Sequence, residues 1–166
     1  MERLWAPWRM EYIGSADQTP GCILCDFPAE GQDSERLILH RAESAYIILN
    51  KYPYSNGHLM VAPYRHTADL PGLSDSELLG VMHLVQVCVR ILTVAAHPDG
   101  FNIGVNLGRV AGAGVADHVH MHVVPRWNGD TNFMPVIGDL RVIPESLRSV
   151  YQRLRTALAE VLDGES

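Results

Sequence analysis

The stretch His118-Val119-His120-Met121-His122-Val123 alternates imidazole and apolar side chains. Because a period of two is typical of a β-strand, this pattern predicts a strand over residues 117–125 with its apolar side chains in the core. The three histidines are then expected on one face, with successive side chains about 6.6 Å apart. A solvated strand face is the purely structural alternative, but three imidazoles in one row favour a chemical use.

Two chemical uses compete for such a row. Metal ligation by all three histidines requires side chains about 13 Å apart to converge on metal–nitrogen distances of about 2.0 Å, which a regular strand does not allow. Phosphoryl chemistry is geometrically easier, because one neutral imidazole can be the nucleophile while its neighbour binds phosphate oxygens or protonates a leaving group. The row therefore favours chemistry at phosphorus.

Four further apolar runs fit the remainder of a sheet. Residues 37–40, 45–50 and 58–63 are separated by polar or turn-forming residues, so they predict a meander of antiparallel strands. Residues 101–106 predict another strand ahead of the histidine row. Together these runs predict an antiparallel sheet of about five strands.

Two helices are predicted beside the sheet. Ser74 and Glu77 form the pattern of a capping box, and the helix that they begin should run to about Ala96. The apolar spacing after Pro144 predicts a C-terminal helix over 144–163. The first 36 residues, which contain Cys22 and Cys25, read as an irregular segment. The fold class is therefore predicted to be α+β, with an antiparallel sheet and two helices.

Composition limits the function classes. The 166 residues are 47% hydrophobic and 19% charged, which indicates a single globular domain over residues 1–166. A net charge of −6 without a basic run argues against binding of a nucleic acid polymer. The first residues lack the pattern of a secretory signal, so we expect a cytoplasmic protein. The apolar stretch 78–96 is interrupted by His83, Gln86 and Arg90, which predicts a buried helix and no membrane association.

Four stretches carry a resemblance to a known family. His118-Val119-His120-Met121-His122-Val123-Val124-Pro125-Arg126 resembles the H-x-H-x-H-x-x motif of the histidine-triad (HIT) family, and Asn50–His58 is similar to that family's first nucleotide-contact segment. Residues 125–133 and Leu4–Met10 are similar to the bacterial branch of diadenosine tetraphosphate phosphorylases. The resemblance covers roughly Cys22 to Arg126 and implies the HIT-like fold.

The resemblance also implies roles for the three histidines. His120 matches the nucleophile that forms a nucleotidyl-histidine intermediate, and the carbonyl of His118 matches the acceptor of its Nδ1–H. His122 matches the histidine that contacts phosphate. The implied activity is phosphorolysis or hydrolysis of an adenine dinucleoside polyphosphate, with water or inorganic phosphate as the second nucleophile.

Nucleotide contacts are expected around this row. The resemblance assigns Asn50 to the ribose and Asn106 to phosphate or ribose. Gly112 and Gly114 belong to a glycine-rich loop whose backbone N–H groups could approach an anion. This loop has Gly114-Val115 where many relatives carry a Gln-Ser or Gln-Thr pair, so contacts to the leaving group must come from elsewhere.

Arg126 and Trp127 complete the predicted nucleotide site. Arg126 can bind phosphate, although a surface ion pair with a carboxylate is the usual role of a single arginine. Trp127 can stack on a base, although burial of the ring is the commoner use of tryptophan. His58, which begins the third strand of the meander, is predicted to be structural.

Cys22 and Cys25 have the spacing of half a zinc site. The resemblance implies that His66 and His118 supply the other two ligands, which gives a closed four-ligand set and hence a structural zinc ion. Two reduced cysteines with a solvent-exposed His66 are the alternative.

Two rival functions remain at the level of the sequence. One is hydrolysis of a nucleoside phosphoramidate or of a dinucleoside polyphosphate. The other is a zinc-stabilised nucleotide-binding regulatory module without turnover. The resemblance further implies a homodimer with long helices or sheet edges at its twofold axis, and the expected partners are a small nucleotide and inorganic phosphate.

Overall fold

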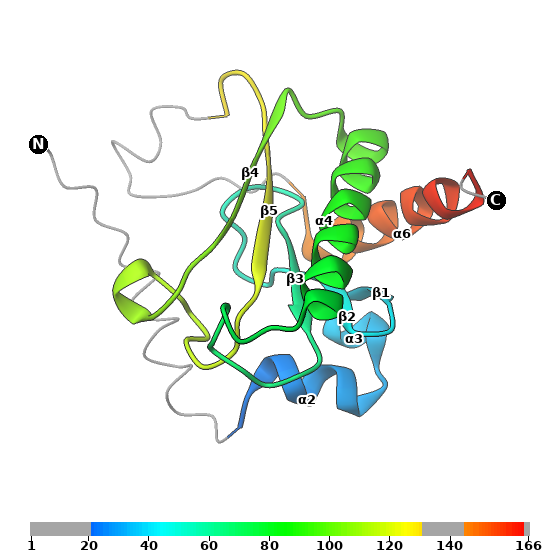
Figure 1. Ribbon diagram of the computed structural model, residues 1–166. Helices are drawn as coiled ribbons and strands as arrows, with labels where there is room; N and C mark the ends of the chain where they lie inside the picture. Colours follow the sequence, from blue (N-terminus) through cyan, green and yellow to red (C-terminus); the bar gives the residue numbers. More distant parts are fainter. Residues whose placement is uncertain (1–20, 131–144, 165–166) are drawn as a thin grey trace, which may run out of the picture.

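A computed structural model of the chain describes residues 21–130 and 145–164 (Figure 1). Five strands form one antiparallel sheet in the order β1-β2-β3-β5-β4. Their bounds are Ile38–Arg41 for β1, Ala45–Leu49 for β2, Leu59–Pro63 for β3, Gly100–Val105 for β4 and Met121–Arg126 for β5. The predicted α+β fold with a five-stranded antiparallel sheet is confirmed.

The histidine strand begins later than the sequence pattern predicts. β5 starts at Met121, where its pairing with Val61 of β3 and with Val105 of β4 begins. The alternation of side chains continues through residues 117–120, but no strand partner accompanies it there. His118 and His120 therefore lie in the segment that enters β5, and only His122 is on the strand itself.

The long helix α4, Asp75–Ala96, confirms the predicted capping box and end point. The Glu77 side chain accepts from the Ser74 N–H, and Arg65 donates to the same carboxylate at 2.7 Å. These bonds, that of Arg65 foremost, lower the pKa of Glu77 to about 2. α4 is long and apolar enough to cross a membrane, yet one of its faces is buried on β2, β3 and β5 as part of the core.

The C-terminal helix α6, Leu147–Asp163, begins after Ser146, whose hydroxyl accepts from the Ser149 N–H at 3.2 Å. It was predicted to begin near Pro144, which lies outside the described residues. Its apolar face packs on α4 and β1. Both long helices therefore cover the same face of the sheet, to the right of β5 in Figure 1.

Two short helices precede the sheet, where an irregular segment was expected. They are α2, Ile23–Glu30, and α3, Asp33–Arg36. The remaining N-terminal residues, 1–20, lie outside the described part of the chain, and so does the Leu4–Met10 stretch. α2 packs with Tyr46 and Ile48 on the face of the sheet that α4 leaves uncovered.

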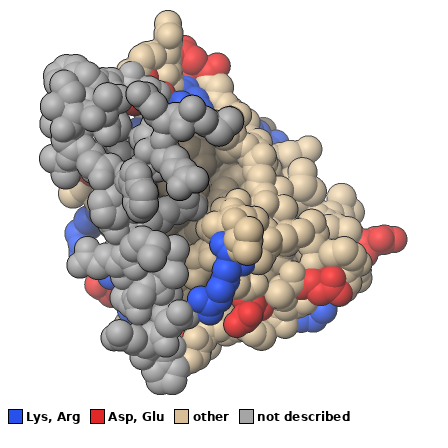
Figure 2. Space-filling view, turned by 90° about the vertical axis from the view of Figure 1, so that its left-hand side faces the viewer, with Lys and Arg blue, Asp and Glu red and all other residues tan. Residues whose placement is uncertain are grey.

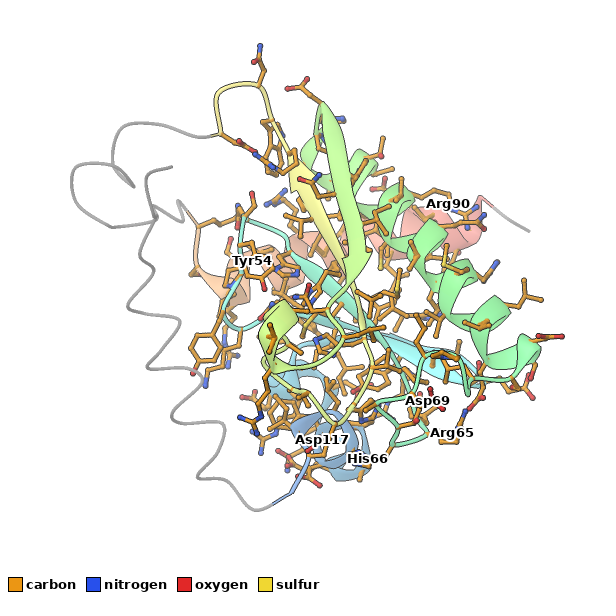
Figure 3. All side chains as sticks on the ribbon, turned by 60° about the vertical axis from the view of Figure 1, so that its left-hand side comes forward. Tyr54, Arg65, His66, Asp69, Arg90 and Asp117 are labelled. Carbon is orange, nitrogen blue, oxygen red and sulfur yellow. The ribbon has the colours of Figure 1, made fainter. Side chains whose placement is uncertain are left out.

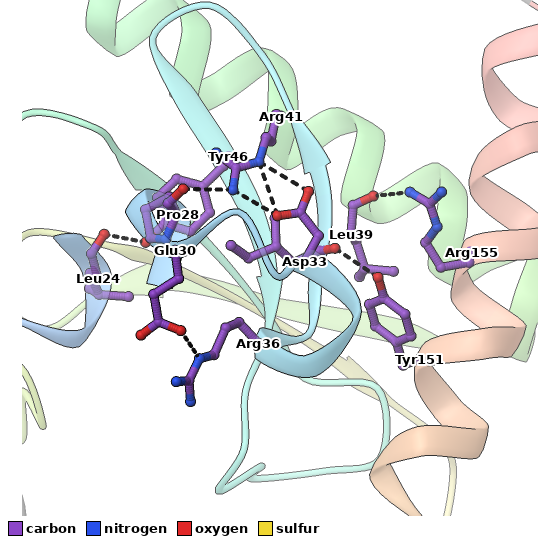
Figure 4. Close-up of polar contacts among 11 residues, drawn as sticks. Leu24, Pro28, Glu30, Asp33, Arg36, Leu39, Arg41, Tyr46, Tyr151 and Arg155 are labelled. Carbon is purple, nitrogen blue, oxygen red and sulfur yellow. Dashed lines mark hydrogen bonds and ion pairs between the residues drawn. The ribbon is translucent and has the colours of Figure 1, made fainter. Parts of the chain in front are cut away.

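A proline inside α2 explains how this helix is held. Pro28 has no N–H to donate to the Leu24 carbonyl one turn earlier. The buried Tyr46 hydroxyl of β2 donates to that carbonyl instead, at 2.6 Å, as Figure 4 shows. Arg41 of β1 reaches the Pro28 carbonyl at 2.8 Å and pairs with Asp33. The strands therefore satisfy the polar groups that α2 and α3 expose.

The β1 edge of the sheet is sealed by α6. Tyr151 donates to the Ile38 carbonyl at 3.0 Å, and Arg155 donates to the Leu39 carbonyl at 2.7 Å (Figure 4). Carbonyls on this edge are therefore satisfied by helix side chains, and a further strand is kept away. At the other edge, β4 pairs only with β5 among the described residues.

Candidate active site and metal site

His120 lies at the entrance to β5 and is 5% exposed. Its Nδ1–H donates to the His118 carbonyl at 2.8 Å, so the lone pair of the neutral ring is on Nε2. Burial lowers the pKa of His120, against the opposing effect of this hydrogen bond. At neutral pH the ring is therefore uncharged, with a bare Nε2 nitrogen of the kind that a nucleophile requires.

His122 is held in the opposite tautomer. Its Nδ1 lies 2.9 Å from Nε2 of His58, which is fully buried. The His58 Nδ1 accepts from the Tyr54 backbone N–H at 3.1 Å, so His58 must carry its proton on Nε2 and donate it to His122. His122 in turn carries its own proton on Nε2. The ring centroids of His120 and His122 are 4.8 Å apart, so a ring with an unprotonated Nε2 is the neighbour of a ring with a protonated Nε2.

His58 is the site residue that the sequence analysis missed. It was predicted to be structural, but the contact with His122 joins segments 64 positions apart in the sequence. Its place within Asn50–His58, the segment that resembles a nucleotide-contact region, was the available signal. The Asn50 side-chain amide lies 3.3 Å from the same His58 Nδ1, and its oxygen accepts from the Tyr52 N–H. Asn50 therefore supports the orientation of His58.

The glycine-rich segment borders this row on β4. Gly104 pairs with His122 across the sheet, and a Cβ atom at Gly104 would meet no atom of the described residues within 4 Å, so these residues leave space beside the imidazole. Asn106 follows β4 and lies 3.5 Å from the Gly112 carbonyl. The N–H groups of Ala111, Gly112 and Ala113 donate to carbonyls within the loop. These three N–H groups therefore have acceptors within the loop, and contact of Gly112 and Gly114 with the nucleotide stays a prediction.

Arg126 and Trp127 lie at the far end of β5. Arg126 is four positions along the strand from His122, which corresponds to about 13 Å. Arg126 is exposed and pairs with Asp130 at 2.5 Å and with Asn102 at 2.7 Å. Trp127 donates its indole N–H to the Ala96 carbonyl at the end of α4, at 3.1 Å. The structure thus gives both side chains structural partners and does not bring them to the histidines.

A second cluster lies at the start of α2. The ligand atoms of Cys22, Cys25, His66 and His118 all fall within 4.8 Å of one another. The Nδ1 atom of His118 is 3.4 Å from both sulfur atoms, and that of His66 is 3.4 Å from the Cys25 sulfur. Tetrahedral zinc with sulfur and nitrogen ligands requires such separations to be about 3.6 Å. The four predicted ligands therefore form a set that can bind a metal ion.

The protonation of this cluster also fits a cation. His118 Nε2–H donates to the Pro63 carbonyl at 2.8 Å, which leaves the lone pair on the Nδ1 atom that faces the two sulfurs. Burial and the neighbouring Cys22 raise the pKa of the Cys25 thiol to about 11, so a cation must displace a proton there.

Figure 3 shows His66 and Asp117 together at the lower end of the molecule, well below Tyr54.

The comparison with family models decides the classification. The model of the HIT domain matches residues 31–129, a span that contains β1 to β5 and the whole histidine row. The chain belongs to the HIT family. The resemblance seen in the triad stretch is thereby confirmed, and the HIT domain is the part of the chain that carries the histidines.

Individual relatives refine this result. The chain is 41% identical over 167 residues to an AP-4-A phosphorylase from Mycobacterium tuberculosis, covering 96% of this chain and 85% of that protein. A Zn-bound histidine triad family protein from Mycobacterium smegmatis has a similar structure, with a TM-score of 0.71 and 32% identity over 88% of this chain and 98% of that one. The chain is also 29% identical over 137 residues to an adenosine 5'-monophosphoramidase from Schizosaccharomyces pombe, covering 82% of this chain and 98% of that protein.

Proposed function

We propose that the chain is a nucleotidyl transferase that cleaves an adenine dinucleoside polyphosphate and passes the adenylyl group to inorganic phosphate. The observation that carries this proposal is the pair of opposite tautomers in the histidine row. His120 presents a bare Nε2, while His122 carries a proton on the same atom of its ring. One nitrogen is thus suited to attack phosphorus, and its neighbour is suited to donate to an oxygen.

The chemistry proceeds in two displacements. In the first, His120 Nε2 attacks the α-phosphorus, a P–N bond forms, and the bond from phosphorus to the bridging oxygen breaks. Diadenosine tetraphosphate would release ATP in this step, and the N–H of His122 Nε2 would donate a hydrogen bond to the leaving oxygen while keeping its proton. In the second, an oxygen of inorganic phosphate attacks the same phosphorus and the P–N bond breaks, which gives ADP and frees His120.

The acceptor is inferred from two features. The similarity to the AP-4-A phosphorylase extends over nearly the whole chain, and the Gln-Ser or Gln-Thr pair common in relatives is replaced by Gly114-Val115. Asn50 and Asn106 are proposed to contact the nucleotide, since Asn50 lies beside His58, the partner of His122, and Asn106 directly follows β4, which pairs with β5. For Arg126 and Trp127 the ion pair and the indole hydrogen bond support structural roles instead.

The metal site is proposed to hold zinc in a structural role. Cys22, Cys25, His66 and His118 supply two sulfur and two nitrogen donors, the preferred set of a closed tetrahedral site. Zinc bound there would contribute to folding and would tie α2 to the segment that enters β5. His120 and His122 are not among these ligands, so the histidines of the proposed reaction remain available to substrate.

A homodimer is proposed through the β4 edge and α4. Since α6 occupies the β1 edge, β4 is the edge open to another strand among the described residues. Ile103 on β4 and Leu79 and Met82 on α4 have exposed apolar side chains. Light scattering at micromolar concentration should give twice the chain mass, and Ile103→Glu should lower it. A monomeric wild-type chain would exclude this assembly.

The cellular setting follows from the expected substrates. A small nucleotide and inorganic phosphate are cytoplasmic metabolites, and no partner macromolecule is needed for the reaction. On the face in Figure 2, charged side chains of both signs are scattered over the described surface, which offers no basic stripe for a nucleic acid polymer there. We therefore infer a cytoplasmic enzyme that acts on small molecules.

Product analysis tests the proposed function. Incubation with diadenosine tetraphosphate and inorganic phosphate should give ADP and ATP, with a rate that depends on phosphate concentration. AMP and ATP at a rate indifferent to phosphate would identify water as the acceptor and a hydrolase. The similarity to the phosphoramidase supports one second candidate. Cleavage of an adenosine phosphoramidate without cleavage of the tetraphosphate would replace the substrate while retaining the role of His120.

A further inference from the structure

His118 belongs to both clusters at once. Its imidazole carries the Nδ1 atom that faces Cys22 and Cys25, and its backbone carbonyl accepts the Nδ1–H of His120. The side chain is fully buried. A single residue therefore joins the metal-binding set to the acceptor that fixes the tautomer of the proposed nucleophile.

The strand ladder does not hold this carbonyl in place. β5 begins at Met121, so the peptide group of His118 lies beyond the last pairs with β3 and β4. Among the described residues, tertiary contacts fix its direction. The Val119 N–H donates to the Thr67 carbonyl at 2.7 Å, and His118 Nε2–H donates to the Pro63 carbonyl at 2.8 Å. Thr67 directly follows His66, another member of the metal-binding set, and Pro63 precedes His66 by three positions.

We infer that the Cys22–Cys25–His66–His118 site positions the nucleophile, because a cation that fixes the His118 ring also fixes the carbonyl that orients His120. The expected effect of this site on the reaction rate rests on the proposed function, whereas its effect on the orientation of His120 does not. A bound cation would join residues 22–25, 66 and 118. It would thereby restrain residues 117–120, which have no partner in the strand ladder. His118 is thus a positioning residue as well as a metal ligand. Without the bound cation, the His120 ring should rotate and no longer hold a single tautomer.

Nuclear magnetic resonance of the histidine side chains tests the link without substrate. In zinc-loaded protein, ¹⁵N-labelled His120 should show one tautomer with a protected Nδ1–H proton, a signal assigned by its loss in His120→Asn. Chelation of the zinc should mix the tautomers or expose that proton to exchange, and reloading should restore it. A core variant, Leu154→Ala, serves as the control, because it lowers stability far from the cluster and should keep the signal. An unchanged His120 signal after zinc removal would overturn the inference.

Removal of zinc could unfold the protein, so a second test uses two variants that keep four metal ligands. His118→Cys and His66→Cys each leave three cysteines and one histidine, so both should retain zinc. His118→Cys removes the bond to Pro63 and changes the residue whose carbonyl holds His120. Its kcat should fall about 10- to 100-fold with little change in KM, and the His120 signal should broaden. His66→Cys should affect both far less. Equal effects of the two substitutions would contradict the inference.

The two proposals fail separately. If zinc removal alters the His120 signal but no nucleotide is cleaved, the positioning link stands and the proposed function is wrong. If nucleotidyl transfer is observed and its rate and the His120 signal are both indifferent to zinc, the proposed function stands and the link is wrong.

Discussion

At the scale of the residue, the site depends on the placement of three protons. His120 and His122 are chemically identical side chains two positions apart, yet their hydrogen-bond partners put the proton on Nδ1 in one ring and on Nε2 in the other. A backbone carbonyl is the partner of His120, and a second buried imidazole, His58, is the partner of His122. The division of roles between the two histidines thus comes from their neighbours.

Replacement of the proposed nucleophile gives the simplest prediction at this scale. His120→Asn should reduce turnover by several orders of magnitude while nucleotide binding stays measurable. The asparagine amide has no nucleophilic nitrogen, and the other residues of the pocket are unchanged. Single-turnover kinetics and equilibrium binding with the same nucleotide separate the two quantities. If the variant retains more than a few per cent of the wild-type rate, another residue must be the nucleophile.

The role of His58 leads to a second prediction. His58→Phe should lower kcat about 10-fold or more, because an apolar ring can neither accept from the Tyr54 N–H nor donate to His122. His83→Phe on the exposed side of α4 is the matched control and should keep the wild-type kcat. Steady-state kinetics on both proteins provides the measurement. Equal rates for the two variants would show that His122 needs no partner.

At the scale of the element, the sequence did not predict the short helix α2 or the residue at which β5 begins. The meander, the capping box of α4 and the Cys22–Cys25 pair were predictable, because each has a local pattern or a marked spacing. His66 and His118 could be added to the metal-binding set only through the family resemblance, because nothing local in the sequence joins them to the cysteines. α2 was missed because Pro28 argues against a helix, and only the distant Tyr46 hydroxyl compensates for it. The start of β5 was missed because alternation of side chains does not report where the partner strands end. The contact between His58 and His122 is likewise tertiary.

The contact between Pro28 and Tyr46 predicts a coupling between two substitutions. Tyr46→Phe should lower the free energy of unfolding by about 1–2 kcal/mol, because the buried Leu24 carbonyl loses its donor. In a Pro28→Ala background, residue 28 regains an N–H that can donate to the same carbonyl, so the same substitution should cost less. Denaturant unfolding of the four proteins measures the difference. Identical costs in both backgrounds would disprove the compensation.

At the scale of the whole molecule, the two long helices determine which face and which edge of the sheet are left for substrate or for a partner chain. α4 and α6 take one face of the sheet and α6 takes the β1 edge. The histidine row projects on the other face, where Met60 pairs with His122 and α2 brings the cysteines. This division places the proposed reaction and the metal-binding set on one side, and it leaves α4 and β4 for the proposed dimer.

Stability should respond to pH through buried histidines. Burial, with Arg155 and His83 adding to it, lowers the pKa of His40, and burial also lowers the pKa of His120. The unfolded chain, with histidine pKa values near 6.5, then binds more protons below that pH than the folded chain does. The free energy of unfolding should therefore decrease as pH falls below about 6.5, and His40→Gln should reduce the slope. Denaturant unfolding between about pH 7.5 and 5.5 provides the test, and a free energy that rises on acidification would contradict it.

The central claim is a double displacement through a nucleotidyl-histidine, and the stereochemical course at phosphorus tests it most directly. Each in-line displacement inverts the configuration at the phosphorus atom, so two successive displacements return the original configuration. A dinucleoside polyphosphate with a chiral thiophosphate at the α-position should therefore give a nucleotide product with retained configuration. Inversion would show that the acceptor attacks the substrate in a single step, and His120 would then not be the nucleophile.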